Sequence, residues 1–174
     1  MAYRRIVLLS DTHGFLDEAM LRHMQNCDEI WHAGDIGRVQ ILNQLESMAT
    51  VRAVYGNIDG TDIRLRCPEH LRFEVAGLKV WMTHIGGRPP RYAQGILPIL
   101  RRERPDVFIC GHSHILLVHR VPSWGGLHVN PGAAGVSGFH HVRTMLTMDL
   151  ADGEVQNLRV IEWPRAQTTK ISNA

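Results

Sequence analysis

Three short apolar segments alternate with two segments of helical periodicity in the first third of the chain, and this alternation limits the fold more than any other feature. The apolar segments span residues 4–11, 29–35 and 50–57. Over 15–26 and again over 41–48, apolar side chains recur every three or four positions, as on one face of a helix. The order strand, helix, strand, helix, strand predicts a parallel sheet joined by right-handed crossovers.

The rest of the chain predicts further strands that are mostly antiparallel. Residues 71–75 and 78–82 flank Ala76-Gly77, which indicates a hairpin. A helical segment over 92–104, interrupted by Gly95 and Pro98, precedes a buried strand over 106–111. Short alternating segments follow at 116–121, 127–130, 144–150 and 154–161. We expect one α/β domain over residues 1–174, with a polar tail over 164–174 that is frayed.

Composition excludes several classes of protein. Nineteen basic and seventeen acidic residues give a net charge of +2, so a broad nucleic-acid-binding face is not expected. No apolar run approaches the roughly 20 residues of a membrane span, and the run over 6–9 reaches Asp11 too soon for a signal peptide. Cys27, Cys67 and Cys110 are odd in number and lack C-x-x-C spacing, which favours small buried side chains over disulfides. We therefore expect a cytoplasmic protein without a membrane partner, and the sequence is compatible with a homo-oligomer.

Polar residues that can bind metals gather where the expected strands end. Eleven histidines are unusually many for a chain of this length, and four of them belong to this set. The set comprises Asp11, His13, Asp35, Asn57, His84, His112 and His114. Any one of them alone would be a capping or loop residue. Because ligand sites of open α/β sheets form at the carboxyl ends of strands, we expect all seven to meet at one sheet edge.

The donor types indicate a pair of metal ions. Two carboxylates, one carboxamide and four imidazoles suit Mn²⁺, Fe, Zn²⁺, Ni²⁺ or Co²⁺ better than Ca²⁺. Seven donors exceed what one tetrahedral ion needs, whereas two ions about 3.5–4 Å apart that share a carboxylate would use them all. Such pairs catalyse phosphoryl transfer, and their net positive charge lowers the pKa of a bridging water toward roughly 7.

Five short motifs identify the family that the sequence resembles. They are Asp11-Thr12-His13, Gly34-Asp35, Gly56-Asn57, Thr83-His84 and Gly111-His112-Ser113-His114. In this order they closely resemble the blocks of the calcineurin-like metallophosphoesterases, over residues 5 to about 135. Each block alone occurs often by chance, whereas five in order at strand ends are specific. Asn130-Pro131-Gly132 and the short length resemble the small bacterial and archaeal phosphodiesterase branch.

The resemblance implies a fold, a reaction and a ligand set. The implied fold is a two-layer β-sandwich flanked by helices, and the reaction is hydrolysis of phosphate esters, diesters above all, by in-line attack of a hydroxide that bridges two divalent transition-metal ions. Manganese is the metal that we favour. Asp11, His13, Asp35 and His114 would hold one ion, and Asp35, Asn57, His84 and His112 the other, so that Asp35 bridges. Gly34, Gly56 and Gly111 are expected to let the backbone turn sharply at the strand ends.

Three further positions complete the expected catalytic and substrate-binding set. Asp59 is either a carboxylate that orients a metal ligand or part of an ordinary Asp-Gly turn, and we group it with Asp35 and Asn57 as catalytic. Arg88 and Arg91 follow His84 closely, and we assign them to phosphate binding, although solvated loop arginines fit the same pattern.

One position departs from the family pattern. Many members place a histidine directly after the metal-binding asparagine, and here Ile58 stands there. An isoleucine cannot donate a proton to a leaving group. An alternative function is a catalytically weak metal-binding or protein-interaction scaffold of the same fold, like the retromer subunit related to this family. The intact ligand set favours the enzyme, and the near-neutral charge argues against a DNA nuclease.

Overall fold

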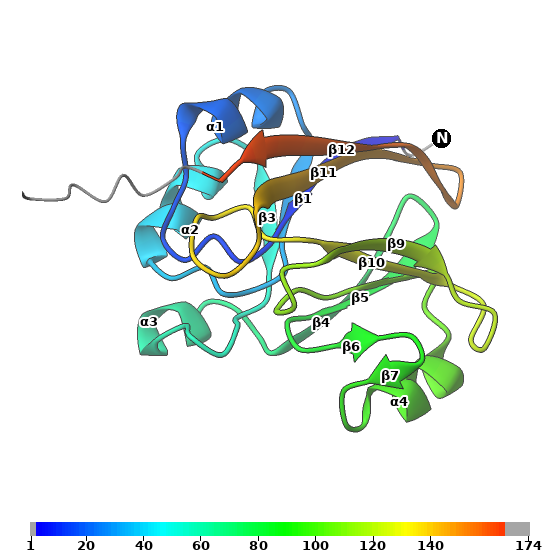
Figure 1. Ribbon diagram of the computed structural model, residues 1–174. Coiled ribbons are helices and arrows are strands. Elements are labelled where there is room, and N and C mark those ends of the chain that lie inside the picture. The colour runs from blue at the N-terminus through cyan, green and yellow to red at the C-terminus, as the bar shows by residue number, and fades with distance from the viewer. Residues whose placement is uncertain (1–2, 166–174) are drawn as a thin grey trace, which may run out of the picture.

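Two five-stranded sheets pack face to face in the computed structural model, which describes residues 3–165 (Figure 1). The strands of the first sheet are β1 (Arg4–Leu9), β2 (Glu29–His32), β3 (Thr50–Ala53), β11 (Val142–Ala151) and β12 (Glu154–Pro164). Their order is β12-β11-β1-β2-β3. The three N-terminal strands are parallel, as the alternation of strands and helices predicts, while β11 runs antiparallel to β1.

The second sheet contains more parallel pairing than the sequence indicated. Its strands are β4 (His70–Val75), β5 (Leu78–Thr83), β8 (Val107–Ile109), β9 (Leu116–Arg120) and β10 (Leu127–Pro131). The predicted hairpin is present as β4 and β5, and the sheet order is β4-β5-β8-β10-β9. However, β8 is parallel to both β5 and β10. A helix connects β5 to β8, which lets the chain re-enter the sheet in the same direction.

Four helices cover the outer faces of the two sheets in the described part of the chain. They are α1 (Glu18–Met24), α2 (Val39–Glu46), α3 (Thr61–Arg64) and α4 (Ile96–Glu103). Pro98 does not break α4 because it lies in the first turn, where its missing N–H group removes no helical bond. The hairpin of β6 (Gly87–Arg88) and β7 (Arg91–Tyr92), like α3, is too short to leave a periodic sequence pattern.

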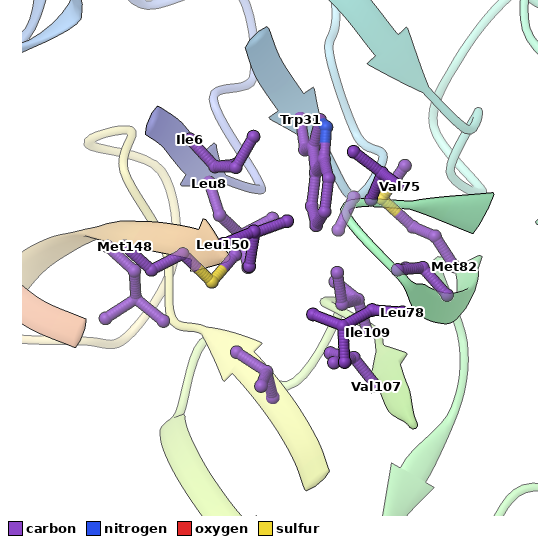
Figure 2. Packing of buried hydrophobic residues seen from close by; sticks show 14 of the residues in the cluster. Ile6, Leu8, Trp31, Val75, Leu78, Met82, Val107, Ile109, Met148 and Leu150 are labelled. Carbon is purple, nitrogen blue, oxygen red and sulfur yellow. The ribbon is translucent and has the colours of Figure 1, made fainter. Parts of the chain in front are cut away.

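Side chains of β1 alternate between two apolar layers. Ile6 and Leu8 enter the core between the sheets, where they meet Trp31 and residues of the second sheet such as Met82 (Figure 2). The intervening side chains of β1 join the cluster that α1 and α2 cover. A strand buried on both faces accounts for the unbroken apolar run in the sequence. The predicted α/β fold, a two-layer β-sandwich flanked by helices, is confirmed.

The C-terminal end of the described chain is part of the first sheet. Pro164, expected at the start of a frayed tail, is the last residue of β12 and pairs with Val142 of β11. The remainder of that tail, 166–174, lies outside the described residues. Among residues 3–165, no helix combines the length and the apolar character needed to cross a membrane.

Candidate metal centre

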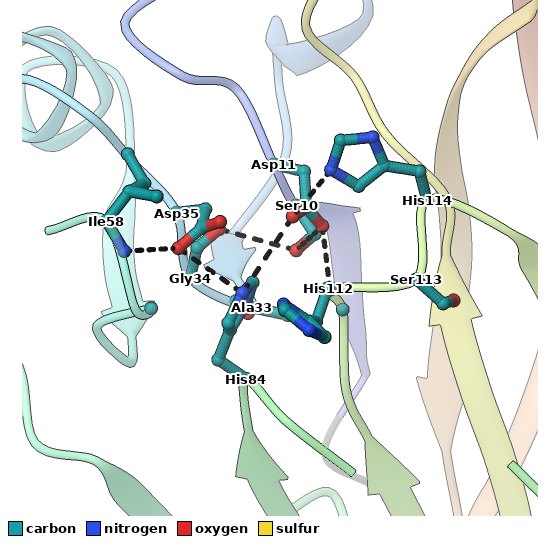
Figure 3. A network of polar contacts seen from close by, with 12 residues as sticks. Ser10, Asp11, Ala33, Gly34, Asp35, Ile58, His84, His112, Ser113 and His114 are labelled. Carbon is teal, nitrogen blue, oxygen red and sulfur yellow. Dashed lines mark hydrogen bonds and ion pairs between the residues drawn. The ribbon is translucent and has the colours of Figure 1, made fainter. Parts of the chain in front are cut away.

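Six of the seven predicted metal ligands converge where strands of the two sheets end, and Figure 3 labels all of them except His13. Their donor atoms form two groups, and within each group the atoms lie within 4.8 Å of one another. The first group is Asp11, His13 and His114, and the second is Asp35, His84 and His112. The loops that follow β1 and β2 of the first sheet and β5 and β8 of the second sheet carry these residues. Segments a hundred positions apart therefore meet as predicted, but strands of both sheets contribute to the cluster, not the edge of a single sheet.

Asp35 lies between the two groups. Its Oδ1 atom is 3.3 Å from Nε2 of His84, and its Oδ2 atom is 3.6 Å from Nε2 of His13. Asp11 faces the same histidines, with Oδ1 at 3.9 Å from His84 and 4.0 Å from His13. Each oxygen of the Asp35 carboxylate therefore faces a histidine of a different group, which is the position that a bridging ligand needs.

The donor atoms themselves are unsatisfied in a way that fits a bound cation. Oδ1 of Asp11 and Nε2 of His13 and His84 are buried, yet they have no hydrogen-bond partner. Nδ1 of His84 donates to the carbonyl oxygen of Ala33 at 2.8 Å, so in the neutral ring Nε2 carries a lone pair and faces two carboxylates. Lone pairs and carboxylate oxygens repel one another unless a positive charge lies between them, so this set fits divalent metal ions.

The carboxylates and histidines of the cluster shift one another's pKa values. Burial by itself would raise the pKa of Asp11, but the neighbouring rings of His114 and His84 lower it. Burial likewise opposes the ionisation of Asp35, whose pKa His84 lowers in spite of it. The pKa of His84 is raised by the same two carboxylates, against the effect of burial. The two buried carboxylates therefore favour their ionised form and stabilise a positive charge beside them.

Five of the six clustered residues have a left-handed backbone conformation. The φ angles are 54° at Asp11, 49° at His13, 53° at Asp35, 67° at His112 and 58° at His114. This conformation is uncommon for residues other than glycine and costs about 1–2 kcal/mol each. Backbone strain repeated at the residues that converge on one point is typical of a functional site.

Glycine is needed directly before three of the predicted ligands, mainly because neighbouring atoms lie too close to leave room for a Cβ atom. Gly34 has a φ of 97°, so it makes the sharp turn expected of it. Gly56 and Gly111 are different, because a Cβ atom there would lie 2.0 Å from Oδ1 of Asp35 and 2.1 Å from Oγ of Ser10. Only glycine lets these two loops pack against the cluster.

Asn57, the seventh predicted ligand, lies between two residues that contact the Asp35 carboxylate, Gly56 and Ile58. It is exposed and lines a hollow of about 600 Å³ together with His84, Arg64 and Glu69. The preceding residue, Gly56, packs directly on the Asp35 carboxylate. The structure therefore places Asn57 next to the second group of predicted ligands, in the lining of the hollow that His84 shares.

The sequence matches a protein-family model described as the calcineurin-like phosphoesterase superfamily domain over residues 5–153. The chain belongs to this superfamily. A protein of Methanothermobacter thermautotrophicus described as a probable metallophosphoesterase is 29% identical over 136 residues, which are 75% of this chain and 77% of the relative. Membership of the calcineurin-like phosphoesterases gives the chain a phosphoesterase role, with divalent metal ions as cofactors.

Solved structures support the same fold. A novel archaeal phosphodiesterase has a TM-score of 0.71 at 23% identity, covering 91% of this chain and 99% of its own. A single mutant of Vps29 from Entamoeba histolytica has a TM-score of 0.73 at 17% identity, covering 92% of this chain and 98% of its own. At these identities the likeness concerns the fold alone.

Ile58 stands beside the Asp35 carboxylate, where many calcineurin-like phosphoesterases have a histidine. Its backbone N–H group donates to Oδ1 of Asp35 at 3.1 Å, and its side chain is 47% exposed (Figure 3). The side chain therefore faces solvent at the site rather than packing beneath it. The backbone helps to fix Asp35, while the side chain offers no proton.

The Asp59 carboxylate binds backbone N–H groups of two loops, and no hydrogen bond in the described part of the chain joins it to the side chain of a predicted metal ligand. Its buried carboxylate accepts N–H groups from Ile36 at 3.1 Å, Gly37 at 2.7 Å and Gly56 at 2.8 Å. These amides belong to the loops that follow Asp35 and precede Asn57. Asp59 therefore contacts the loops that carry the predicted metal ligands through their backbone.

Arg88 and Arg91 do not join the hollow beside the cluster. They face each other across the β6–β7 hairpin and line a separate hollow with Leu117 and His119. Proximity to His84 in the sequence suggested phosphate binding, but the hairpin places both arginines in the lining of this other hollow. The structure therefore gives no support to their predicted role at the metal centre.

Two histidines outside the family motifs support the site. Nε2 of His32 lies 2.9 Å from Oγ1 of Thr12, while its Nδ1 accepts the N–H of Gly34 at 3.2 Å, which ties the first two ligand loops together. His140 contacts His114, with 3.2 Å between their Nδ1 atoms. No motif spacing identifies either residue, and the only sequence signal for His140 is the glycine-rich loop before it.

Proposed function

We propose that the chain is a phosphodiesterase with a dinuclear metal centre. Asp11, His13, Asp35 and His114 would hold one ion, and Asp35, Asn57, His84 and His112 would hold the second. Two divalent ions bound there, with manganese favoured, would supply the positive charge that binds a phosphoryl group and activates water for in-line attack on phosphorus. The protein's own part is to fix the ligands and to shape the surrounding hollows.

The observation that carries the proposal is the position of Asp35. Its two oxygens face histidines of the two different ligand groups at 3.3 and 3.6 Å. The His84–Ala33 bond and the Ile58 backbone bond hold the ring and the carboxylate in this arrangement. Two groups of donors that share one carboxylate are what a pair of metal ions requires.

The preference for diesters rests on the surroundings of the cluster. One hollow adjoins it at Asn57 and His84, and a second adjoins it at His112 and His114. A diester has an organic group on either side of phosphorus, and the two hollows offer a place for each. A diester also carries a single negative charge, which demands fewer cationic side chains than a monoester does.

A protein-interaction scaffold is the alternative, since Vps29 proteins are among the structural neighbours. Loss of ligand residues would favour that role. Here all seven predicted ligands are present, and three of their buried donor atoms lack any other partner. The set of donors therefore favours the enzyme.

The test is an assay of protein stripped of metal and reloaded with single metals. We expect turnover of bis(4-nitrophenyl) phosphate with Mn²⁺, a higher kcat/KM than for 4-nitrophenyl phosphate, and loss of activity on chelation. A higher kcat/KM for the monoester would contradict the diester preference. Full activity in protein shown by elemental analysis to contain no metal would contradict the mechanism.

A further inference from the structure

Large apolar side chains lie exposed around the metal centre. Ile58, Ile85 and Ile115 each directly follow a predicted metal ligand, and they are 47%, 45% and 54% exposed. Phe139 directly precedes His140 and is 100% exposed. A fully exposed phenylalanine forgoes roughly 2–3 kcal/mol of burial, so large apolar side chains exposed beside a predicted metal centre indicate an apolar ligand.

Two of these residues form the wall of a defined hollow. Ile115 and Phe139 line a space of about 460 Å³ whose other lining residues include the metal ligands His112 and His114. Arg, Lys, Asp and Glu are absent from its lining. An occupant of this hollow therefore lies next to the metal centre and meets a surface without permanent charge.

The loop that carries Phe139 is fixed against the site. His140, the next residue, hydrogen-bonds through Nε2 to the carbonyl oxygen of Gly135 at 2.9 Å and meets His114 through Nδ1. Gly138, on the other side, packs so closely that a Cβ atom there would lie 2.4 Å from Nδ1 of His114. Both neighbours of Phe139 are thus held against the metal-binding histidine, and the exposure of its ring is built into the loop.

We propose that this hollow is a subsite for an aryl or nucleobase-like substituent of the phosphate ester, which stacks on Phe139 while its phosphoryl group lies at the metal centre. The inference rests on the proposed function and adds the substrate class to it. A planar apolar group is favoured because an aromatic ring gains both burial and ring stacking on Phe139. A small alkyl group would bury less apolar surface and could not stack, and a charged group would gain neither.

The experiment compares phenylphosphonate with methylphosphonate as ligands of the Mn²⁺-loaded protein by isothermal titration calorimetry, which needs no turnover. We expect phenylphosphonate to bind roughly tenfold more tightly to the natural protein. In Phe139→Ala this ratio falls to nearly one, while Phe139→Leu keeps part of it. Leu65→Ala is the matched control, because Leu65 is 82% exposed and does not line the hollow. Its ratio stays that of the natural protein.

The possible results distinguish failure of the proposed subsite from failure of the proposed phosphoesterase function. Equal binding of the two phosphonates, or a ratio that survives Phe139→Ala, would overturn the subsite and leave the phosphoesterase centre intact. Failure of both phosphonates to bind would contradict the phosphoryl-binding centre itself. A dimer seen by sedimentation that Phe139→Ala dissociates would assign the apolar wall to a second copy of the chain and overturn the proposal.

Discussion

The Nδ1 atoms of His114 and His140 lie 3.2 Å apart, a separation at which one ring donates and the other accepts. Nε2 of His140 also lies 2.9 Å from the carbonyl oxygen of Gly135, which can only accept. In the neutral His140 ring, Nδ1 is therefore the acceptor, and His114 carries its proton on Nδ1. The lone pair of His114 Nε2 is then directed at Asp11 Oδ1, 3.2 Å away, where the proposed metal would bind.

His140→Ala should weaken metal binding at the first group of ligands about 10–100-fold, because His114 loses the partner that fixes its tautomer. Calorimetric titration with Mn²⁺ measures the affinity, and ¹⁵N NMR of the metal-free protein reports the tautomer of His114. His141→Ala is the control, since His141 is exposed. An unchanged His114 tautomer in His140→Ala would show that His140 does not position the ring.

Asp59→Ala should destabilise the protein by about 2–4 kcal/mol, because three backbone N–H groups lose a charged acceptor in a buried place. Chemical denaturation measures this change. Asp62→Ala, three residues away at an exposed position, should cost only about 0.5 kcal/mol. Equal effects of the two substitutions would mean that the amides around Asp59 find other partners.

Ile58→His should accelerate hydrolysis of esters with poor leaving groups by about 10²–10⁴-fold, because it places a proton donor beside Asp35. The side chain of Ile58 is half exposed, so the substitution leaves the core unchanged. The measurement is the dependence of rate on leaving-group pKa, which should become shallower in the variant. A variant that folds and binds metal but shows the same dependence as the natural protein would show that the leaving group is protonated elsewhere.

The stability of the protein should fall as the pH is lowered from 7 to 4. Burial lowers the pKa of His128 from 6.5 to about 4, so between these values the unfolded chain binds a proton that the folded chain does not. The free energy of unfolding therefore decreases with falling pH, with a contribution from His128 of at most about 1.4 kcal/mol per pH unit. Urea denaturation should show that the free energy of unfolding depends less steeply on pH in His128→Leu than in the natural protein. An identical dependence in the two proteins would contradict the lowered pKa of His128.

The sequence predicted those features that depend on local pattern. The apolar segments that end at Asp11, Asp35 and Asn57 predicted β1, β2 and β3 and the strand ends that carry three of the proposed ligands, because a change from apolar to polar residues marks a strand end. That strands of the second sheet meet them there was not predicted. The parallel pairing of β8 was missed, since it depends on which strands become neighbours after the α4 crossover.

The surroundings of the ligands were harder to predict because they depend on contacts between distant segments. Which amides the Asp59 carboxylate reaches is decided by how the loops after β2 and β3 pack together. Arg88 is close to His84 in the sequence, but the β6–β7 hairpin carries it to another hollow. His140 contacts His114 although 26 positions separate them in the sequence, and no motif spacing predicts that contact.

The metal content of Asp35→Ala tests the central claim most directly, because only a bridging ligand contributes to both ions. The natural protein, reloaded with Mn²⁺ and freed of excess metal by gel filtration, should contain two ions per chain by elemental analysis. Asp149→Ala, which alters an aspartate at the Arg5 ion pair on the first sheet, should match it. Asp35→Ala should retain fewer than one ion per chain, and retention of two ions with the fold intact would contradict the dinuclear centre proposed for this phosphoesterase.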